Sequence, residues 1–259
     1  MNNLFYGNKM LQKFWKIMLR ISLKGLNHNR GHVPNANGEI FTVKYVLKNC
    51  KNAKPVIFDV GANKGQYLSM MLQQISSKYQ PDIHCFEPQQ KAFEKLKEVA
   101  KNQNHITLNN FALGSSKGEI DLYNDNAESE YGSLYPADYF QHDIKLSNKE
   151  RIRIDTLDNY CQERNIEKID FLKIDVEGHE VEVLKGAENY IASGKVDFIQ
   201  FEFGLASIEA RIFFKDFVLL LKDYDIYRIL PNDLELIHYS EYCEIFFVTN
   251  YLAVRKSES

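Results

Sequence analysis

The chain of 259 residues is long enough to bury a full core, yet short enough to form a single α/β domain. Hydrophobic residues make up 44% and charged residues 26%, a globular composition that excludes disordered and fibrous chains. The net charge is −3, but six basic and no acidic residues precede residue 39, which leaves −9 for the remainder and argues against general nucleic-acid binding.

The four cysteines are scattered without a C-x-x-C pair, so they are predicted to be reduced thiols rather than a zinc or redox motif. The sequence has no uncharged apolar stretch of the roughly 18 residues that span a bilayer, and its N-terminus lacks the uninterrupted pattern of a signal peptide. The cytoplasm is therefore the predicted location, with the inner face of the membrane as an alternative that the first element raises.

The first predicted element, residues 9–27, is an amphipathic basic helix. Its two faces are formed by Leu11, Phe14, Trp15 and Met18 on one side and by Lys9, Lys13, Lys16, Arg20 and Lys24 on the other. In the favoured interpretation the apolar face packs on the main domain and the lysines are solvated. In the other, the helix lies on an anionic membrane surface beside a lipid-linked substrate. This helix and a turn-rich linker occupy residues 1–35.

From residue 55 onward, apolar strands alternate with helical segments, a pattern that predicts a mostly parallel sheet with helices on both faces. The predicted strands are PVIFDVG, DIHCFEP, ITLNNFALG, RIRID, IDFLKIDVEG and VDFIQFEFG. The last two segments, YRILPNDLELIHY and EIFFVTNYLAVRK, are expected to close the sheet as an antiparallel pair. A polar, tyrosine-rich stretch over residues 115–150 interrupts the pattern, and residues 36–259 are predicted to form one catalytic domain.

The motif DVGANKG, residues 59–65, joins the first strand to the first helix, at the edge of an open α/β sheet where ligands bind. Gly61 and Gly65 leave room for a ligand near the backbone. Glu87 ends the second strand, where an acid accepts hydrogen bonds from both ribose hydroxyls of a nucleoside.

The predicted ligand is not a dinucleotide, because the middle glycine of the dinucleotide-binding motif G-x-G-x-x-G is missing. The P-loop motif of nucleotide-binding proteins is also absent. Asp59 would repel a pyrophosphate and attract a cation, which favours S-adenosylmethionine. The alternative is a tight strand-to-helix turn with a capping acid and no ligand.

The segment DVEGHE places Asp175, Glu177 and His179 after the fourth strand of the sheet, beside the cofactor turn. A neutral hydroxyl must lose its proton as it attacks a methyl group, so a general base is needed among these residues. His179 titrates nearest neutrality by default, and Asp175 is the strongest functional candidate. A metal site of the form D-x-E-x-H is a weaker alternative and is not predicted. The other alternative is a helix start, in which the acids only complement the helix dipole.

The acceptor is expected to bind under the tyrosine-rich stretch. Tyr131 and Tyr135 offer aromatic faces that stack on sugar CH groups, and Glu202 at the end of the next strand faces the same space. An equally weighted alternative is that these tyrosines only hold a loop on the core.

The motifs IFDVGANKGQY, CFEP, NFALG, TLD, FLKIDVEGHEVEVLKGA and IQFEFG occur in the order found in FkbM-type methyltransferases, which the chain resembles over about residues 36–255. The resemblance implies the class I, Rossmann-like fold, S-adenosylmethionine as cofactor, and O-methylation of a hydroxyl, commonly on a sugar. It assigns cofactor contacts to the methionine half, the ribose, the adenine edge and a Gly-Glu element near the cofactor. The residues are, in that order, Asp59, Gly61, Ala62, Asn63 and Gly65; Glu87; Asn110 and Ala112; and Glu39.

The predicted function is S-adenosylmethionine-dependent O-methylation of a sugar hydroxyl on a surface glycan or glycosylated metabolite. The expected partner is a small-molecule or glycan acceptor, without nucleic acid. Two alternatives from other classes remain: a nicotinamide-binding oxidoreductase, and a non-catalytic cofactor-binding module in which the DVEGHE acids are only a helix start.

Overall fold

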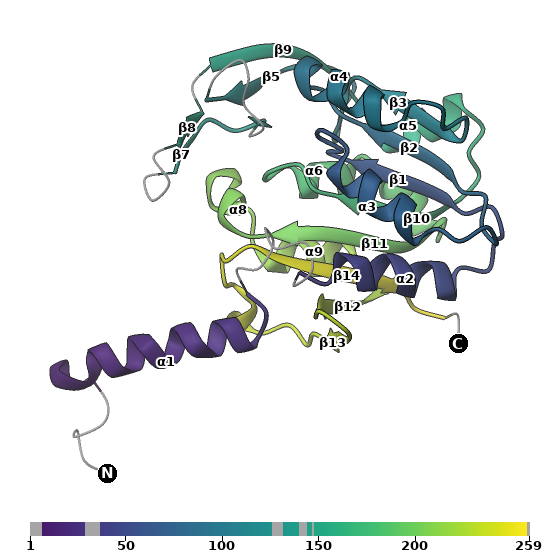
Figure 1. The fold of residues 1–259 in the computed structure, drawn as a ribbon. Coiled ribbons are helices and arrows are strands. Elements are labelled where there is room, and N and C mark those ends of the chain that lie inside the picture. The colour runs from purple at the N-terminus through teal and green to yellow at the C-terminus, as the bar shows by residue number, and fades with distance from the viewer. Residues whose placement is uncertain (1–6, 29–36, 126–131, 140–143, 147, 258–259) are drawn as a thin grey trace.

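The computed structural model describes residues 7–28, 37–125, 132–139, 144–146 and 148–257. In this part of the chain the main sheet has eight strands in the order β13-β12-β14-β11-β10-β1-β2-β3 (Figure 1). The strands are β1 Val56–Val60, β2 Asp82–Phe86, β3 Ile106–Asn109, β10 Ile169–Ile174, β11 Val196–Phe203, β12 Tyr224–Ile229, β13 Leu234–Leu236 and β14 Thr249–Arg255. Strands β3, β2, β1, β10 and β11 run parallel, and β14 lies antiparallel between β11 and β12. The predicted mostly parallel sheet with an antiparallel C-terminal pair is confirmed.

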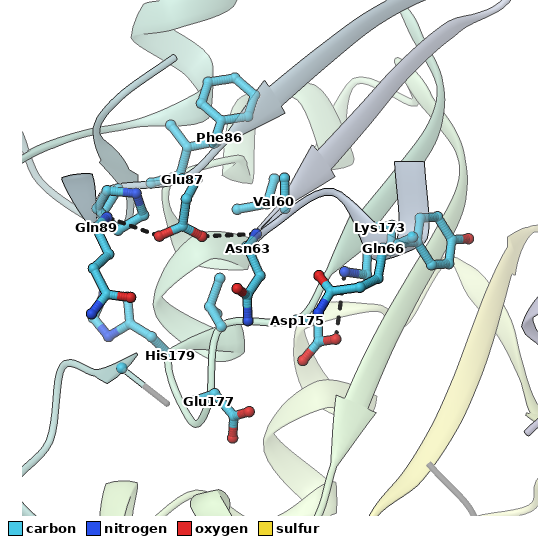
Figure 2. A pocket seen from close by; sticks show the side chains of 18 of the residues that line it. Val60, Asn63, Gln66, Phe86, Glu87, Gln89, Lys173, Asp175, Glu177 and His179 are labelled. Atoms are coloured by element: carbon cyan, nitrogen blue, oxygen red, sulfur yellow. Dashed lines mark hydrogen bonds and ion pairs between the residues drawn. The ribbon is translucent and has the colours of Figure 1, made fainter. Parts of the chain in front are cut away.

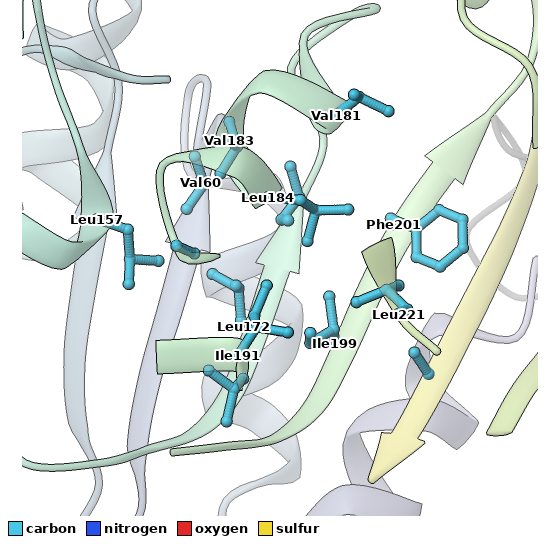
Figure 3. Packing of buried hydrophobic residues seen from close by; sticks show 14 of the residues in the cluster. Val60, Leu157, Leu172, Val181, Val183, Leu184, Ile191, Ile199, Phe201 and Leu221 are labelled. Carbon is cyan, nitrogen blue, oxygen red and sulfur yellow. The ribbon is translucent and has the colours of Figure 1, made fainter. Parts of the chain in front are cut away.

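Helices cover both faces of this sheet because consecutive strand residues point to opposite sides. Ile57 and Phe171 pack with helices α2 Glu39–Asn49, α3 Gln66–Gln74 and α4 Gln90–Val99. Phe58 and Leu172 pack on the other face with α5 Leu157–Glu163, α6 Glu180–Lys185, α7 Glu188–Ala192 and α9 Phe214–Leu220. Figure 3 shows the part of this cluster around Leu172. Both faces are therefore buried, as the continuous apolar strands predict. Helix α8 Leu205–Ala210 follows β11.

Two of the predicted elements are divided in the structure. The helix expected after DVEGHE is split into α6 and α7 at Gly186, where an added Cβ would lie 1.9 Å from the carbonyl oxygen of Gly114. This close approach of two backbones ends the first helix. The segment ITLNNFALG forms β3 in the main sheet and a separate strand, β4 Ala112–Leu113, in a second sheet.

The stretch expected to interrupt the fold forms that second sheet instead. Its strands are β4, β5 Gly118–Asn124, β6 Gly132–Ser133 and β9 Asn148–Asp155, in the order β4-β9-β5-β6. The segment RIRID, predicted as a strand without an assigned sheet, is part of β9. A short pair, β7 Ala137–Tyr139 and β8 Ile144–Leu146, lies beside it (Figure 1). A small core of its own stabilises this sheet, formed by Ala112, Leu122, Ile152 and Ile154.

The N-terminal helix extends away from the body of the molecule (Figure 1). It comprises a single 3₁₀ turn, η1 Lys9–Leu11, and α1 Gln12–Gly25, and α1 contains no buried residue. The favoured expectation that its apolar face packs on the main domain is therefore wrong. Among the described residues, no helix is long and apolar enough to cross a membrane.

Candidate active site

A cavity of about 380 Å³ lies at the carboxyl ends of β1, β2 and β10. Its size falls in the range of small-molecule sites. Five segments of the domain meet there: the start of α2, the turn after β1, the first part of α3, the turn after β2 and the turn after β10, with the second sheet as the remaining wall. Predicted site residues that line it are Glu39, Gly61, Ala62, Asn63, Glu87, Ala112, Asp175, Glu177 and His179.

The turn after β1 is held against the end of β10 by a glycine. Gly61 has φ +80°, and a Cβ there would lie 1.8 Å from the carbonyl oxygen of Asp175. The backbone amides of Gly61 and Ala62 both donate to the Phe86 carbonyl. Gly65, with φ +83°, packs against Leu96 and lies outside the cavity lining. Both glycines are thus required by backbone conformation and packing, and Gly61 brings the turn onto Asp175.

Glu87 lies at the end of β2 with both carboxylate oxygens engaged. The backbone amide of Asn63 donates to Oε2 at 2.9 Å, and that of Gln89 donates to Oε1 at 2.8 Å (Figure 2). Burial raises the pKa of Glu87 to about 7, against the lowering effect of these two hydrogen bonds. The buried side-chain nitrogen of Gln89 has no hydrogen-bond partner within the described segments. This corner therefore offers an acceptor, Glu87, and an unused donor, Gln89, to one ligand.

Asn110 shapes this corner rather than lining it. Its side-chain amide donates to the carbonyl oxygens of Glu87, at 2.9 Å, and Pro88, at 3.0 Å. These two bonds fix the turn after β2, so the contribution of Asn110 is to hold Glu87 in place. Ala112, two residues later, does line the cavity.

Asp59 does not line the cavity but lies behind it, in an ion pair that the sequence analysis does not predict. It is fully buried and stands opposite Lys173 in the β1–β10 register. Lys173 Nζ lies 3.2 Å from Asp59 Oδ1 and 3.4 Å from Asp175 Oδ2. Figure 2 shows the second of these pairs, Lys173 with Asp175. Burial alone would lower the pKa of Lys173, but Asp59, Asp175 and Glu39 outweigh it and raise the pKa. Asp59 thus neutralises a buried lysine. The sequence feature that points to this ion pair is the lysine inside the apolar run IDFLKID, because a buried charge requires a partner.

The turn after β10 directs two carboxylates into the cavity. Glu177 has φ +52° and Gly178 has φ +101°, so the chain reverses sharply there. The backbone amides of Val176 and Gly178 both donate to Glu180 Oε1 at 3.1 Å. Glu180 therefore holds the turn together, while Asp175 and Glu177 line the cavity (Figure 2).

His179 lines the cavity but is held by the second sheet. Its Nδ1 lies 3.2 Å from the hydroxyl of Tyr135, and the ring is buried. Burial lowers the pKa of His179 to about 4, so the imidazole is neutral at pH 7 and a weak proton acceptor. Nearby, the Ser133 hydroxyl donates to the Glu177 carbonyl at 2.7 Å. The second sheet is thus docked on the turn that carries the acids.

Glu177, like Glu87, is a cavity-lining acid whose environment raises its pKa. Burial, Asp175 and Glu180 raise its pKa to about 8. Burial and the nearby acids, Asp175 first, also raise the pKa of Glu202 at the end of β11. Glu202 itself lies outside the cavity lining. A carboxyl with a pKa near the working pH suits a general base.

Only one of the two tyrosines predicted to contact the acceptor, Tyr135, lies in the described part of the chain. Tyr135 contacts His179 and lies outside the cavity lining. Tyr131 lies outside the described residues. The wall on this side consists of Leu122, Gly132 and Leu134. Within the described part of the chain, no group of three or more His, Cys, Asp or Glu residues is arranged to hold a metal ion.

The strand order, with β14 inserted between β11 and β12, and an acid-lined cavity at the carboxyl edge define a class I methyltransferase. Residues 59–226 match the family described as the methyltransferase FkbM domain, and the chain belongs to that family. The family assignment decides in favour of methyl transfer over the nicotinamide alternative.

Similar proteins carry methyltransferase names. The chain is 26% identical over 207 residues to the 2-O-methyltransferase NoeI of Sinorhizobium fredii, covering 74% of this chain and 81% of that protein. It is 26% identical over 192 residues to the hexuronic acid methyltransferase AglP of Haloferax volcanii, covering 74% and 71%. The crystal structure of an FkbM methyltransferase from Methylobacillus flagellatus aligns with a TM-score of 0.49 and 16% identity, covering 80% of this chain and 45% of that one.

Proposed function

We propose that this methyltransferase uses S-adenosylmethionine to methylate a hydroxyl of a sugar. The observation that carries the proposal is the grouping of Glu87, Asp175 and Glu177 around one cavity. Glu87 suits the ribose of a nucleoside, and the other two acids suit a cationic reacting centre beside a hydroxyl that loses its proton. The names of the two relatives, a 2-O-methyltransferase and a hexuronic acid methyltransferase, support a sugar as acceptor.

The residues of the cavity fit this cofactor. Glu87 would accept hydrogen bonds from the ribose hydroxyls, and the unused amide of Gln89 would donate to a ring nitrogen of adenine. Glu39 and Asp175 face the end of the cavity where the ammonium and sulfonium groups would lie, and the only cationic side chain near them, Lys173, is already paired within the described residues. When bound, the sulfonium supplies an activated methyl group for in-line displacement.

The proton of the acceptor hydroxyl is assigned to Glu177. A hydroxyl becomes a competent nucleophile only as its proton leaves, and general base catalysis requires a group within hydrogen-bond reach. Glu177 lines the cavity beside the second sheet, which forms the apolar wall at Leu122 and Leu134. Asp175, held by Lys173, keeps a fixed position next to it. The CH groups of a sugar ring would pack on the apolar wall, with one hydroxyl turned toward Glu177.

The proposed function is tested by incubating the protein with methyl-labelled S-adenosylmethionine and a panel of glycans rich in uronic acids and free 2-hydroxyls. Mass spectrometry is expected to find a sugar that gains one labelled methyl group, sensitive to competition by S-adenosylhomocysteine. A thermal shift with S-adenosylhomocysteine, and none with NADH, is expected alongside. Binding of the cofactor product without label transfer to any sugar hydroxyl would contradict the choice of acceptor.

Replacing Glu87 by Gln is expected to weaken cofactor binding about 10- to 100-fold, because hydrogen bonds to a charged acceptor are lost. The wild-type affinity should depend on pH. The Glu87 pKa is about 7 in the free protein, and ribose hydroxyls favour the ionised form, so binding below pH 7 releases a proton. The affinity therefore falls as the pH falls from 7 to 5.

Calorimetry at several pH values, in buffers of different ionisation enthalpy, measures this proton release. The Glu87→Gln variant should show no release from this position and a flatter affinity profile. The exposed Glu98→Gln, in the same region of the chain, is the matched control. A wild-type affinity that is independent of pH from 5 to 7 would contradict the role of Glu87.

A further inference from the structure

Helix α1 has one strongly basic face and one apolar face. Its cations recur at spacings of three and four residues, which places them along a single side. They are Lys13, Lys16, Arg20 and Lys24, with Lys9 in the preceding turn. No acidic residue precedes Glu39, whereas the rest of the chain carries a net charge of −9. The arm therefore carries an excess of positive charge, outside a body that is acidic overall.

The apolar face of α1 is exposed along its length. Phe14 is 50% exposed, Trp15 42%, Leu19 59% and Ile21 57%. Removing apolar side chains from water is favourable, and this exposed row leaves that hydrophobic contribution unrealised. A contiguous apolar surface of this kind marks an interaction site.

The arm is attached firmly at its base. The Asn27 side-chain amide donates to the Ile229 carbonyl at 2.9 Å. His28 Nδ1 lies 2.8 Å from Thr249 Oγ1, and Arg228 Nη1 donates to His28 Nε2 at 3.0 Å. Burial and then Arg228 lower the pKa of His28 to about 4, so it stays a neutral acceptor for Arg228.

This base lies at the edge of the main sheet that carries the cavity. Thr249, the first residue of β14, pairs with Phe203, the last residue of the parallel strand β11. The arm and the cavity therefore share the carboxyl edge, and Figure 1 shows α1 extending outward on that side.

We propose that α1 binds the surface of an anionic lipid bilayer, with its apolar face in the interfacial region and its cations at the headgroups. At 14 residues the helix is about 21 Å long, too short to span the hydrocarbon core, and its separate basic and apolar faces suit the interface instead. An anionic bilayer offers apolar contacts to one face of the helix and negative charge to the other. A second copy of α1 would cover only the apolar face and would bring a second set of cations.

The acidic body determines which part of the protein approaches the bilayer. Its net charge of −9 is repelled by anionic headgroups, so attraction is confined to the arm. Since the base of the arm lies at the carboxyl edge, binding holds that edge near the bilayer. The proposal concerns the helix alone and does not depend on the methyl acceptor.

The test uses Trp15, the only tryptophan in the chain, as a reporter on α1. The full-length protein is mixed with vesicles of phosphatidylcholine alone or with added phosphatidylglycerol. With the anionic vesicles, Trp15 emission is expected to shift to the blue and to become protected from acrylamide, and the effect should weaken as salt is raised. Flotation of the protein with the vesicles measures the partition coefficient.

Two variants separate the faces of the helix. Lys13→Glu/Lys16→Glu is expected to lower the partition coefficient at least tenfold, since two attractive cations near an anionic surface are replaced by two repelled anions. The matched control, Lys44→Glu/Lys48→Glu on the exposed side of α2, makes the same charge change and should bind like the wild type. Phe14→Ser/Met18→Ser should abolish the blue shift without changing the thermal unfolding, because both side chains are exposed.

Three results would overturn the proposal. One is Trp15 emission that anionic vesicles leave unchanged. Another is equal binding to neutral and anionic vesicles, which would remove the role of the basic face. The last is a blue shift that appears without vesicles and grows with protein concentration, which would assign the apolar face to a second copy of the chain.

Discussion

Replacing Glu177 by Gln is expected to lower the kcat of methyl transfer about 10²- to 10⁴-fold, the usual contribution of a general base. Gln keeps the size of the side chain but cannot accept the proton that the hydroxyl loses. KM for the acceptor should change little, because the amide still fills the same part of the cavity. Initial rates with the labelled donor and a sugar acceptor measure the effect.

The pH profile distinguishes a general base from a merely structural acid. Glu177 must be ionised to accept a proton, and its pKa is raised to about 8. The wild-type rate should therefore rise as the pH rises toward 8 and level off above it, whereas the Glu177→Gln profile should be flat. Glu182→Gln is the control, because that carboxylate contacts Lys185 and Ser115 outside the cavity. An unchanged profile in Glu177→Gln would assign the proton to another group.

Replacing Lys173 by Met is expected to lower the free energy of unfolding by about 3–5 kcal/mol, the cost of removing one partner of a buried ion pair. Met has a similar unbranched shape, so little volume is lost. The fully buried Asp59 carboxylate would be left without the cation that lies 3.2 Å away in the wild type. Since single domains are stable by only about 5–15 kcal/mol, the loss is a large fraction of the total.

Urea denaturation measures this loss, and two further variants interpret it. Lys168→Met, at the other end of β10, removes a partly exposed ion pair with Asp197 and should cost less than about 1 kcal/mol. Adding Asp59→Asn to Lys173→Met should recover much of the stability, because no buried charge then remains at that register position. Equal stability of the Lys173 and Lys168 variants would show that the buried pair contributes no more than a surface pair.

The second sheet could not be predicted from local sequence patterns. Strand and helix alternation is predictable because side-chain periodicity depends only on neighbouring residues. The segment RIRID has the pattern of a strand, and it forms β9, but its period does not say which sheet it joins. The sheet that a strand joins depends on pairing partners that are distant in the sequence, such as β5. The residues of the strand itself do not identify those partners.

The candidate site divides in the same way. The sequence alone determined the alternating core, the turn after β1, and the position of Glu87 and the DVEGHE acids at strand ends, because these depend on short-range periodicity and turn residues. Only the tertiary structure decided that Asp59 pairs with Lys173, that burial leaves His179 neutral, and that the apolar face of α1 stays exposed. Burial and ion pairing are set by which elements lie opposite one another, so they follow from the assembled fold and not from any single segment.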